Sequence, residues 1–261
     1  MKTSRLLALV VAAGLAGPAA AEVQTKTITY QDGDETLTGH LYWDDALEGQ
    51  RPAVLVIHEW WGLNAYAKKR ARMLAELGYV AFAADMYGGE RVTDTPDQAR
   101  EWMKGITSDV QAWRDRAALG LAQLQDSPLV APGQTAAVGY CFGGGTVLQM
   151  AYDGADVRGV VSFHGSLPAL KEGDAESLEA SVLVLHGHAD TFIPDEQIEK
   201  FQAGMEDAGA DWQFVRYGGA RHGFTNPDVG EYGIPNLEYD AAADRRSWED
   251  MQDLFAELFA D

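Results

Sequence analysis

The chain has 261 residues, with 40 acidic and 20 basic side chains, so its formal net charge is −20. An apolar fraction of 46% and a charged fraction of 23% are typical of a globular protein and exclude disordered and collagen-like chains. The negative charge argues against nucleic acid and anionic membranes as partners, because both are themselves negative. A chain of this length can bury a full core without disulfides or a structural metal.

Residues 1–21 have the pattern of a cleaved secretory signal. Two basic residues precede an apolar run over 6–17, and Ala19 and Ala21 form an A-x-A cleavage pattern. The run is too short to span a bilayer comfortably, which disfavours the alternative of an uncleaved anchor. We predict cleavage after Ala21, export to the periplasm or the medium, no membrane contact after cleavage, and one domain over 22–261.

Strand-like and helix-like segments alternate along this domain. Short apolar runs predict strands at 25–30, 37–43, 52–58, 79–84, 135–140, 157–163, 181–186 and 212–217. Helical patterns occur at 64–77, 108–124, 144–152, 194–208 and 241–260. The alternation predicts an α/β fold with a mostly parallel central sheet, helices on both faces and an N-terminal antiparallel hairpin. Ligands of such sheets bind outside the carboxyl ends of the strands, so we expect the functional residues in the loops there.

The segment around Cys141 has the form of a nucleophile elbow. Gly139, Cys141 and Gly143 make a G-x-C-x-G pattern between a predicted strand and a predicted helix, with a thiol in place of a hydroxyl. An elbow nucleophile has positive φ, and the glycines remove the side chains that would collide. The following helix dipole favours thiolate. The alternatives are a buried structural cysteine and a phosphate-binding turn, although the turn lacks both nucleotide-binding patterns.

An elbow nucleophile is followed along the chain by an acid and a histidine, in that order. Asp190 follows the strand at 181–186, and His222 follows the strand at 212–217. We expect His222 to take the thiol proton and later to protonate the leaving group. We expect Asp190 to fix the imidazole tautomer and to stabilise the imidazolium.

His186, His188 and Asp190 also form an H-x-H-x-D pattern, which occurs in binuclear zinc hydrolases. Thr191 stands where a further histidine would be needed, and only His222 remains downstream, so the ligand set is incomplete. We therefore expect no metal and no other cofactor, and we interpret His186 and His188 as structural.

The loop at 58–62 is expected to lie beside the elbow. The backbone N–H groups of Trp60 and Phe142 are the predicted oxyanion donors. The Glu59 carboxylate, close to the thiol, would oppose its ionisation and keep the sulfur neutral at rest; the alternative is a solvated loop charge. Aromatic side chains in or beside these loops predict an apolar pocket for a small organic substrate, lined by Trp61, Tyr87, Phe192 and Phe224.

Five short motifs together resemble the dienelactone hydrolase family of α/β-hydrolases. In the family's order, they are HEWWG (58–62), ADMYGG (84–89), GYCFGG (139–144), HGHAD (186–190) and RHGF (221–224). The resemblance implies an α/β-hydrolase fold and a cysteine–histidine–aspartate triad that hydrolyses small esters or lactones through an acyl-thiol intermediate. It also implies that Glu59 holds the resting thiol and releases it when substrate binds.

The sequence departs from the best-known members of that family at Asn226, where they have an arginine that binds the substrate carboxylate. This difference argues against dienelactone itself as the substrate. Two alternatives stay open: a thioesterase or peptidase using the same triad, and a non-catalytic exported binding protein on a hydrolase scaffold. We expect the protein to be a monomer.

Overall fold

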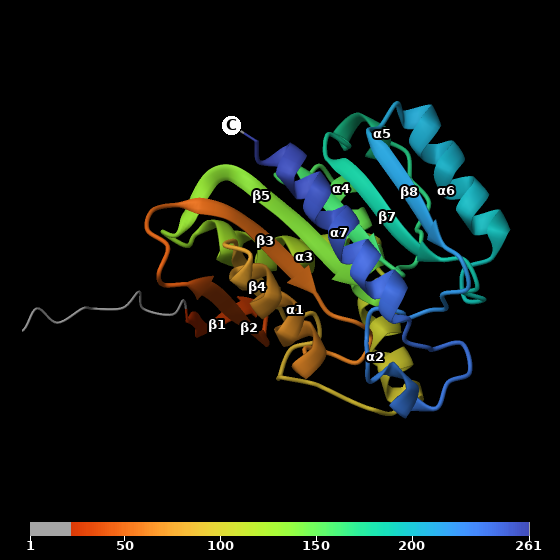
Figure 1. Ribbon diagram of the computed structural model, residues 1–261, viewed down its shortest axis with the longest axis horizontal. Helices are drawn as coiled ribbons and strands as arrows, with labels where there is room; N and C mark the ends of the chain where they lie inside the picture. Colours follow the sequence, from red (N-terminus) through yellow and green to blue (C-terminus); the bar gives the residue numbers. More distant parts are fainter. Residues whose placement is uncertain (1–21, 261) are drawn as a thin grey trace, which may run out of the picture.

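Eight strands form one sheet in the order β1-β2-β4-β3-β5-β6-β7-β8 (Figure 1). They are β1 (Val23–Asp32), β2 (Glu35–Asp44), β3 (Arg51–Ile57), β4 (Val80–Ala84), β5 (Val130–Tyr140), β6 (Gly159–Phe163), β7 (Ser181–Gly187) and β8 (Trp212–Tyr217). The strands from β3 to β8 run parallel, whereas β1 and β2 form an antiparallel hairpin and β2 pairs antiparallel with β4. The predicted sheet and hairpin are confirmed in this computed structural model, which describes residues 22–260.

Helices cover both faces of the sheet, as Figure 1 shows. They are α1 (Ala65–Glu76), α2 (Pro96–Thr107), α3 (Val110–Gln125), α4 (Phe142–Tyr152), α5 (Asp174–Ser177), α6 (Asp195–Ala208), the 3₁₀ helix η1 (Val229–Tyr232) and α7 (Ala241–Leu258). In β3, Val54 and Val56 belong to the core on the face covered by α1, whereas Leu55 and Ile57 belong to the core on the face covered by α3 and α4. Because successive strand residues point to opposite faces, a strand with two cores is apolar throughout.

Helix α2 is absent from the predicted elements, although its sequence is amphipathic: Ala99 is buried, and Trp102, Met103 and Ile106 pack partly buried against the core. Its start does carry a signal, because Pro96 occupies the first helical turn, where its missing N–H costs nothing. The helix packs beside α3 and contributes one wall of the candidate site.

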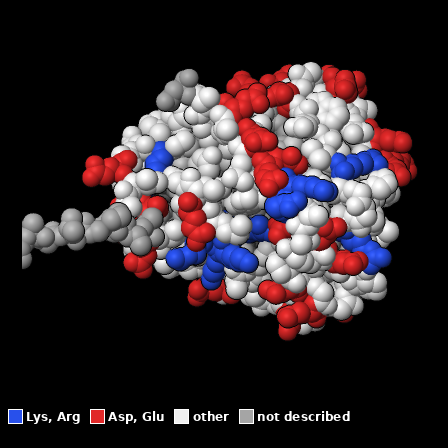
Figure 2. Space-filling model, in the orientation of Figure 1, with Lys and Arg blue, Asp and Glu red and all other residues white. Residues whose placement is uncertain are grey.

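The surface carries the expected excess of acid. Figure 2 shows acidic side chains over much of one face, including a band along α7. Within residues 22–260, none of the helices combines the length and the apolar character that crossing a bilayer requires. The predicted signal segment 1–21 lies outside the described residues, so cleavage and export stay predictions.

Candidate active site

Cys141 lies at a strained turn between β5 and α4. Its φ of 55° and ψ of −111° fall outside the regions that residues with a side chain normally adopt. A Cβ added at Gly139 would overlap the carbonyl of Gly143, and one at Gly143 would overlap the carbonyl of Ile57. The two glycines therefore permit the turn in the way the sequence predicts, and the half-buried thiol lies at the positive end of the α4 dipole.

The close backbone contact at Gly139 leads to a prediction about stability. We expect Gly139→Ala to lower the free energy of unfolding by about 1–3 kcal/mol, because the added methyl group meets backbone that has no room to move. Urea unfolding followed by circular dichroism measures this change. Gly105→Ala in α2 is the matched control, since its Cβ meets nothing within 4 Å, and we expect a gain of about 0.5–1 kcal/mol. Equal stability of Gly139→Ala and the wild type would contradict the elbow geometry.

His222 lies between Cys141 and Asp190. Its Nδ1 donates to Oδ2 of Asp190 at 2.7 Å, while Oδ1 of Asp190 accepts from the Phe192 N–H at 2.8 Å and from Nδ2 of Asn236 at 2.9 Å. Burial alone would raise the pKa of Asp190, but these hydrogen bonds and the charge of His222 lower it to about 2. Burial alone would lower the pKa of His222, but its interactions with Cys141 and Asp190 raise it to about 10. The site thus favours an imidazolium at His222 beside the Asp190 carboxylate.

A buried polar chain supports the loop that carries His222. The His164 ring stands edge-on to the His222 ring, with 5.2 Å between the ring centroids, and its Nε2 lies 2.7 Å from Oγ1 of Thr225. Arg70 of α1 donates to the Thr225 carbonyl and to Oδ1 of Asp244 in α7. None of the supporting residues stands in a recognisable catalytic pattern, so the sequence analysis misses them. Their contacts fix the His222 loop to helices α1 and α7.

Residues that follow β4 hold the loop at 58–62 in place. Nε2 of His58 accepts from the Met86 N–H at 3.2 Å, so its Nδ1 carries the proton, and that nitrogen lies 2.5 Å from the carbonyl of the next residue. The Tyr87 hydroxyl donates to the Trp60 carbonyl at 3.0 Å, and the Tyr87 ring stacks on Phe142. One tyrosine therefore contacts both residues whose N–H groups are the predicted oxyanion donors.

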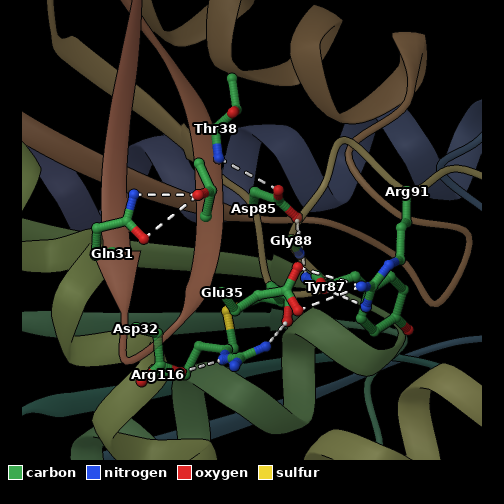
Figure 3. A network of polar contacts seen from close by, with 11 residues as sticks. Gln31, Asp32, Glu35, Thr38, Asp85, Tyr87, Gly88, Arg91 and Arg116 are labelled. Carbon is green, nitrogen blue, oxygen red and sulfur yellow. Dashed lines mark hydrogen bonds and ion pairs between the residues drawn. The ribbon is translucent and has the colours of Figure 1, made fainter.

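A network at the β1–β2 hairpin fixes Tyr87 in turn (Figure 3). Oδ1 of Asp85 accepts from the Tyr87 N–H at 2.9 Å and from the N–H of the next residue at 3.0 Å. Its Oδ2 accepts from the Thr38 N–H at 3.3 Å in β2, and Arg91 pairs with Glu35 at 3.2 Å. The hairpin thereby anchors the loop after β4.

Both predicted oxyanion donors border the site. Phe142 is the first residue of α4, where the backbone N–H has no partner within the helix. The Trp60 N–H donates to no backbone carbonyl among residues 22–260. Both residues line the same cavity as Cys141 and His222, which is compatible with the predicted role.

Glu59 is buried, so it is not a solvated loop charge. Its Oε2 accepts from Nδ2 of Asn226 at 2.8 Å, and within residues 22–260 we find no hydrogen bond from Glu59 to the thiol. Burial raises the pKa of Glu59 to about 7, partly offset by Asn226, by the charge of His222 and by Arg70. Asn226 thus binds Glu59 and is not among the residues that line the cavity beside Cys141. Control of the thiol by Glu59 stays a prediction.

An apolar cavity of about 410 Å³ opens beside Cys141 and His222. Its wall comes from the loop at 58–62, from α2 and from the loops near 192 and 234. A larger hollow of about 520 Å³ is polar, with Asp94, Asp228 and Glu231 in its wall, and Cys141 is not among its lining residues. Because a small organic substrate must reach the sulfur, the apolar cavity is the candidate substrate site.

Of the four aromatic residues predicted to line the pocket, Phe192 does so. The prediction is wrong for Trp61, Tyr87 and Phe224, which are buried and absent from the wall. Trp61 stacks on Tyr232, Phe224 packs on His164, and Tyr87 lies behind Trp60 and Phe142. All three rings belong to the buried core, so they support the site from the interior of the protein.

The H-x-H-x-D motif does not assemble into a ligand set. Within the described part of the chain, no three His, Cys, Asp or Glu side chains are grouped to hold a metal ion. His186 is buried, which lowers its pKa to about 4, and it packs on Phe214, whereas His188 is exposed. Asp190 instead faces His222.

Comparison with known proteins shows the family and agrees with the fold. The model of the dienelactone hydrolase family matches residues 38–259. A Synechocystis protein named by inference as a carboxymethylenebutenolidase is 30% identical and covers 90% of this chain and 97% of its own. The crystal structure of a dienelactone hydrolase-like promiscuous phosphotriesterase from metagenomic libraries is 41% identical, with a TM-score of 0.89 and coverage of 92% and 100%. A dienelactone hydrolase from Anabaena variabilis, 20% identical with a TM-score of 0.60 and coverage of 88% and 98%, shares the fold.

Proposed function

The chain belongs to the dienelactone hydrolase family, and we propose that it hydrolyses a small carboxylic ester or lactone with Cys141 as the nucleophile. His222 acts as the acid and base, and Asp190 orients and charges its ring. The observation that carries the proposal is the position of His222, which is hydrogen-bonded to Asp190 and lines the same apolar cavity as Cys141.

Acylation begins when His222 takes the Cys141 thiol proton, which produces a thiolate and an imidazolium. The Cys141 thiolate attacks the ester carbonyl carbon, a C–S bond forms, and the carbonyl oxygen becomes an oxyanion that accepts from the Trp60 and Phe142 N–H groups. As the C–O bond to the leaving group breaks, the His222 imidazolium donates its proton to the departing alkoxide. The alcohol leaves, and the acyl group remains on sulfur as a thioester.

Deacylation regenerates the thiolate and the imidazolium. Neutral His222 takes a proton from water while the water oxygen attacks the thioester carbonyl. The tetrahedral intermediate collapses, the C–S bond breaks, and the carboxylic acid leaves. The products are the acid, a Cys141 thiolate and an imidazolium at His222, so the proton balance closes. The Asp190 carboxylate stabilises that imidazolium in both half-reactions.

Rapid quenching tests the covalent step. During turnover of 4-nitrophenyl acetate, we expect mass spectrometry to find one acetyl group, on the peptide that contains Cys141, together with a burst of nitrophenol. The Cys141→Ala variant is expected to show neither the acetyl group nor the burst. An acetyl group on another residue, or turnover by the variant at the rate of the wild type, would refute the proposed nucleophile.

A substrate panel separates the alternatives. A thioesterase prefers thioesters to matched oxygen esters, a peptidase cleaves amides, and a binding protein releases no alcohol from any of them. Neutral phosphotriesters belong in the panel because the 41% identical relative bears the name of a phosphotriesterase. Preferential turnover of oxygen esters or lactones supports the proposed function.

A further inference from the structure

We propose that the cavity selects esters and lactones whose distal part is uncharged, and that it discriminates against substrates with a carboxylate at that end. This inference rests on the proposed function and specifies its substrate class. It follows from the composition of the cavity wall and from the places where the nearby charges are already bound.

The cavity wall offers a distal carboxylate almost no partners. Beyond Cys141 and His222, which act on the reacting bond, the wall is formed mostly by hydrocarbon and aromatic side chains. Met103, Phe192, Ile193, Ile234 and Leu237 all line it, and Ser166 supplies a small polar group. A carboxylate transferred from water into such a wall loses its hydration without gaining hydrogen bonds, which is strongly unfavourable.

Arg100 is the arginine of the cavity wall, but its side chain is exposed to solvent. Its side chain is 60% exposed, and Nη1 donates to Oδ1 of Asp97 at 2.7 Å. The guanidinium is therefore solvated and already next to a carboxylate. An exposed pair of this kind contributes little attraction to a further anion.

The other arginines near the site are also paired with carboxylates. Arg70 is buried behind the His222 loop and pairs with Asp244. Arg91 pairs with Glu35, and Arg221 pairs with Glu238 at 2.9 Å. None of these three arginines lines the cavity. Asn226, next in the chain to Thr225, is engaged with the carboxylate of Glu59.

Two effects oppose an anion, and they act over different distances. The net charge of −20 repels anions at long range, and salt screens that repulsion. The apolar wall acts only on a group that has entered the cavity, where screening is weak. The proposal concerns the second effect, so the test must separate the two.

A matched pair of esters, one neutral and one anionic, tests the selection by the cavity wall. The neutral ester is 4-nitrophenyl methyl adipate, and the anionic ester is 4-nitrophenyl hydrogen adipate; they share the leaving group and the chain and differ by one methyl group at the distal carboxyl. At pH 7 we expect kcat/KM to favour the neutral ester by at least about tenfold, because only the anion must desolvate a charge. We expect the preference to persist at about 0.5 M salt, where long-range repulsion is largely screened.

A variant of the wall should weaken the preference. Met103 lies on α2, one turn after Arg100, and lines the cavity. Met103→Lys places an unpaired ammonium beside the distal group, and we expect the ratio of neutral to anionic kcat/KM to fall by at least about threefold. Met103→Leu keeps the volume and the apolar character and is expected to keep the ratio.

The outcomes distinguish this inference from the proposed function. Equal kcat/KM for the two esters, or a preference that disappears at high salt, would overturn the selection by the wall while Cys141-dependent turnover continued. An unchanged ratio in Met103→Lys would also overturn it. Failure to hydrolyse either ester, or turnover that survives Cys141→Ala, would instead overturn the proposed function.

Discussion

Exchange of Cys141 for alanine is expected to reduce kcat for ester hydrolysis by at least about 10³-fold. Alanine removes the sulfur that forms the acyl bond, while the cavity and the oxyanion donors stay in place. The residual rate would then come from binding and from the Trp60 and Phe142 N–H groups. Stopped-flow and steady-state assays with 4-nitrophenyl esters measure the loss.

Two further variants show whether Cys141 acts as one unit with His222. His222→Ala is expected to reduce kcat by about 10²–10⁴-fold, and the double variant to be no slower than the slower single variant, because each change disables the same step. His188→Ala is the matched control, since this exposed histidine belongs to the H-x-H-x-D motif but lies outside the proposed machinery. Losses that add in the double variant would indicate separate roles, and a His188→Ala loss as large as that of His222→Ala would contradict the assignment.

The sequence predicts the meeting of Cys141, Asp190 and His222 for a geometric reason. Each follows a strand of a parallel sheet, and the carboxyl ends of neighbouring parallel strands share one edge. The sequence also predicts the need for glycine at the elbow, because a side chain there would collide with backbone a few residues away or at the end of β3.

The direction of loop side chains is not encoded so locally. The apolar character of Trp61, Tyr87 and Phe224 is compatible with a pocket wall and with a core, and tertiary contacts choose the core. For Tyr87 the choice depends on Asp85, whose carboxylate accepts from the Tyr87 N–H and from β2. Residue type alone does not contain such a contact between distant segments.

The partners of the acidic groups are equally non-local. Asn226 and Glu59 are separated by 167 positions, and Asn236 and Asp190 by 46, yet each pair is hydrogen-bonded. Neither asparagine stands in a pattern that predicts its partner. The sequence therefore predicts which carboxylates matter but not what holds them.

Asp190→Asn tests the electrostatic side of the mechanism. Asparagine is nearly isosteric, but it removes the negative charge, and its amide can hold the imidazole in the wrong tautomer. We expect kcat/KM at pH 7 to fall by about 10²–10⁴-fold. Steady-state kinetics with the neutral adipate ester measures this fall, and circular dichroism checks the fold.

The dependence of kcat/KM on pH is also expected to change in Asp190→Asn, in a defined direction. The pKa of His222 is raised to about 10 by negative neighbours, so the imidazolium that protonates the leaving group persists at neutral pH and is lost as pH rises through that value. Removing the Asp190 charge removes one of the causes, so the alkaline limb of kcat/KM should move to lower pH. Asn236→Leu is the matched control: it deletes a hydrogen bond to Asp190 but keeps its charge, so its limb should move less. An alkaline limb that stays in place in Asp190→Asn would show that the carboxylate does not charge the ring, and Asp190 would keep only a role in orientation.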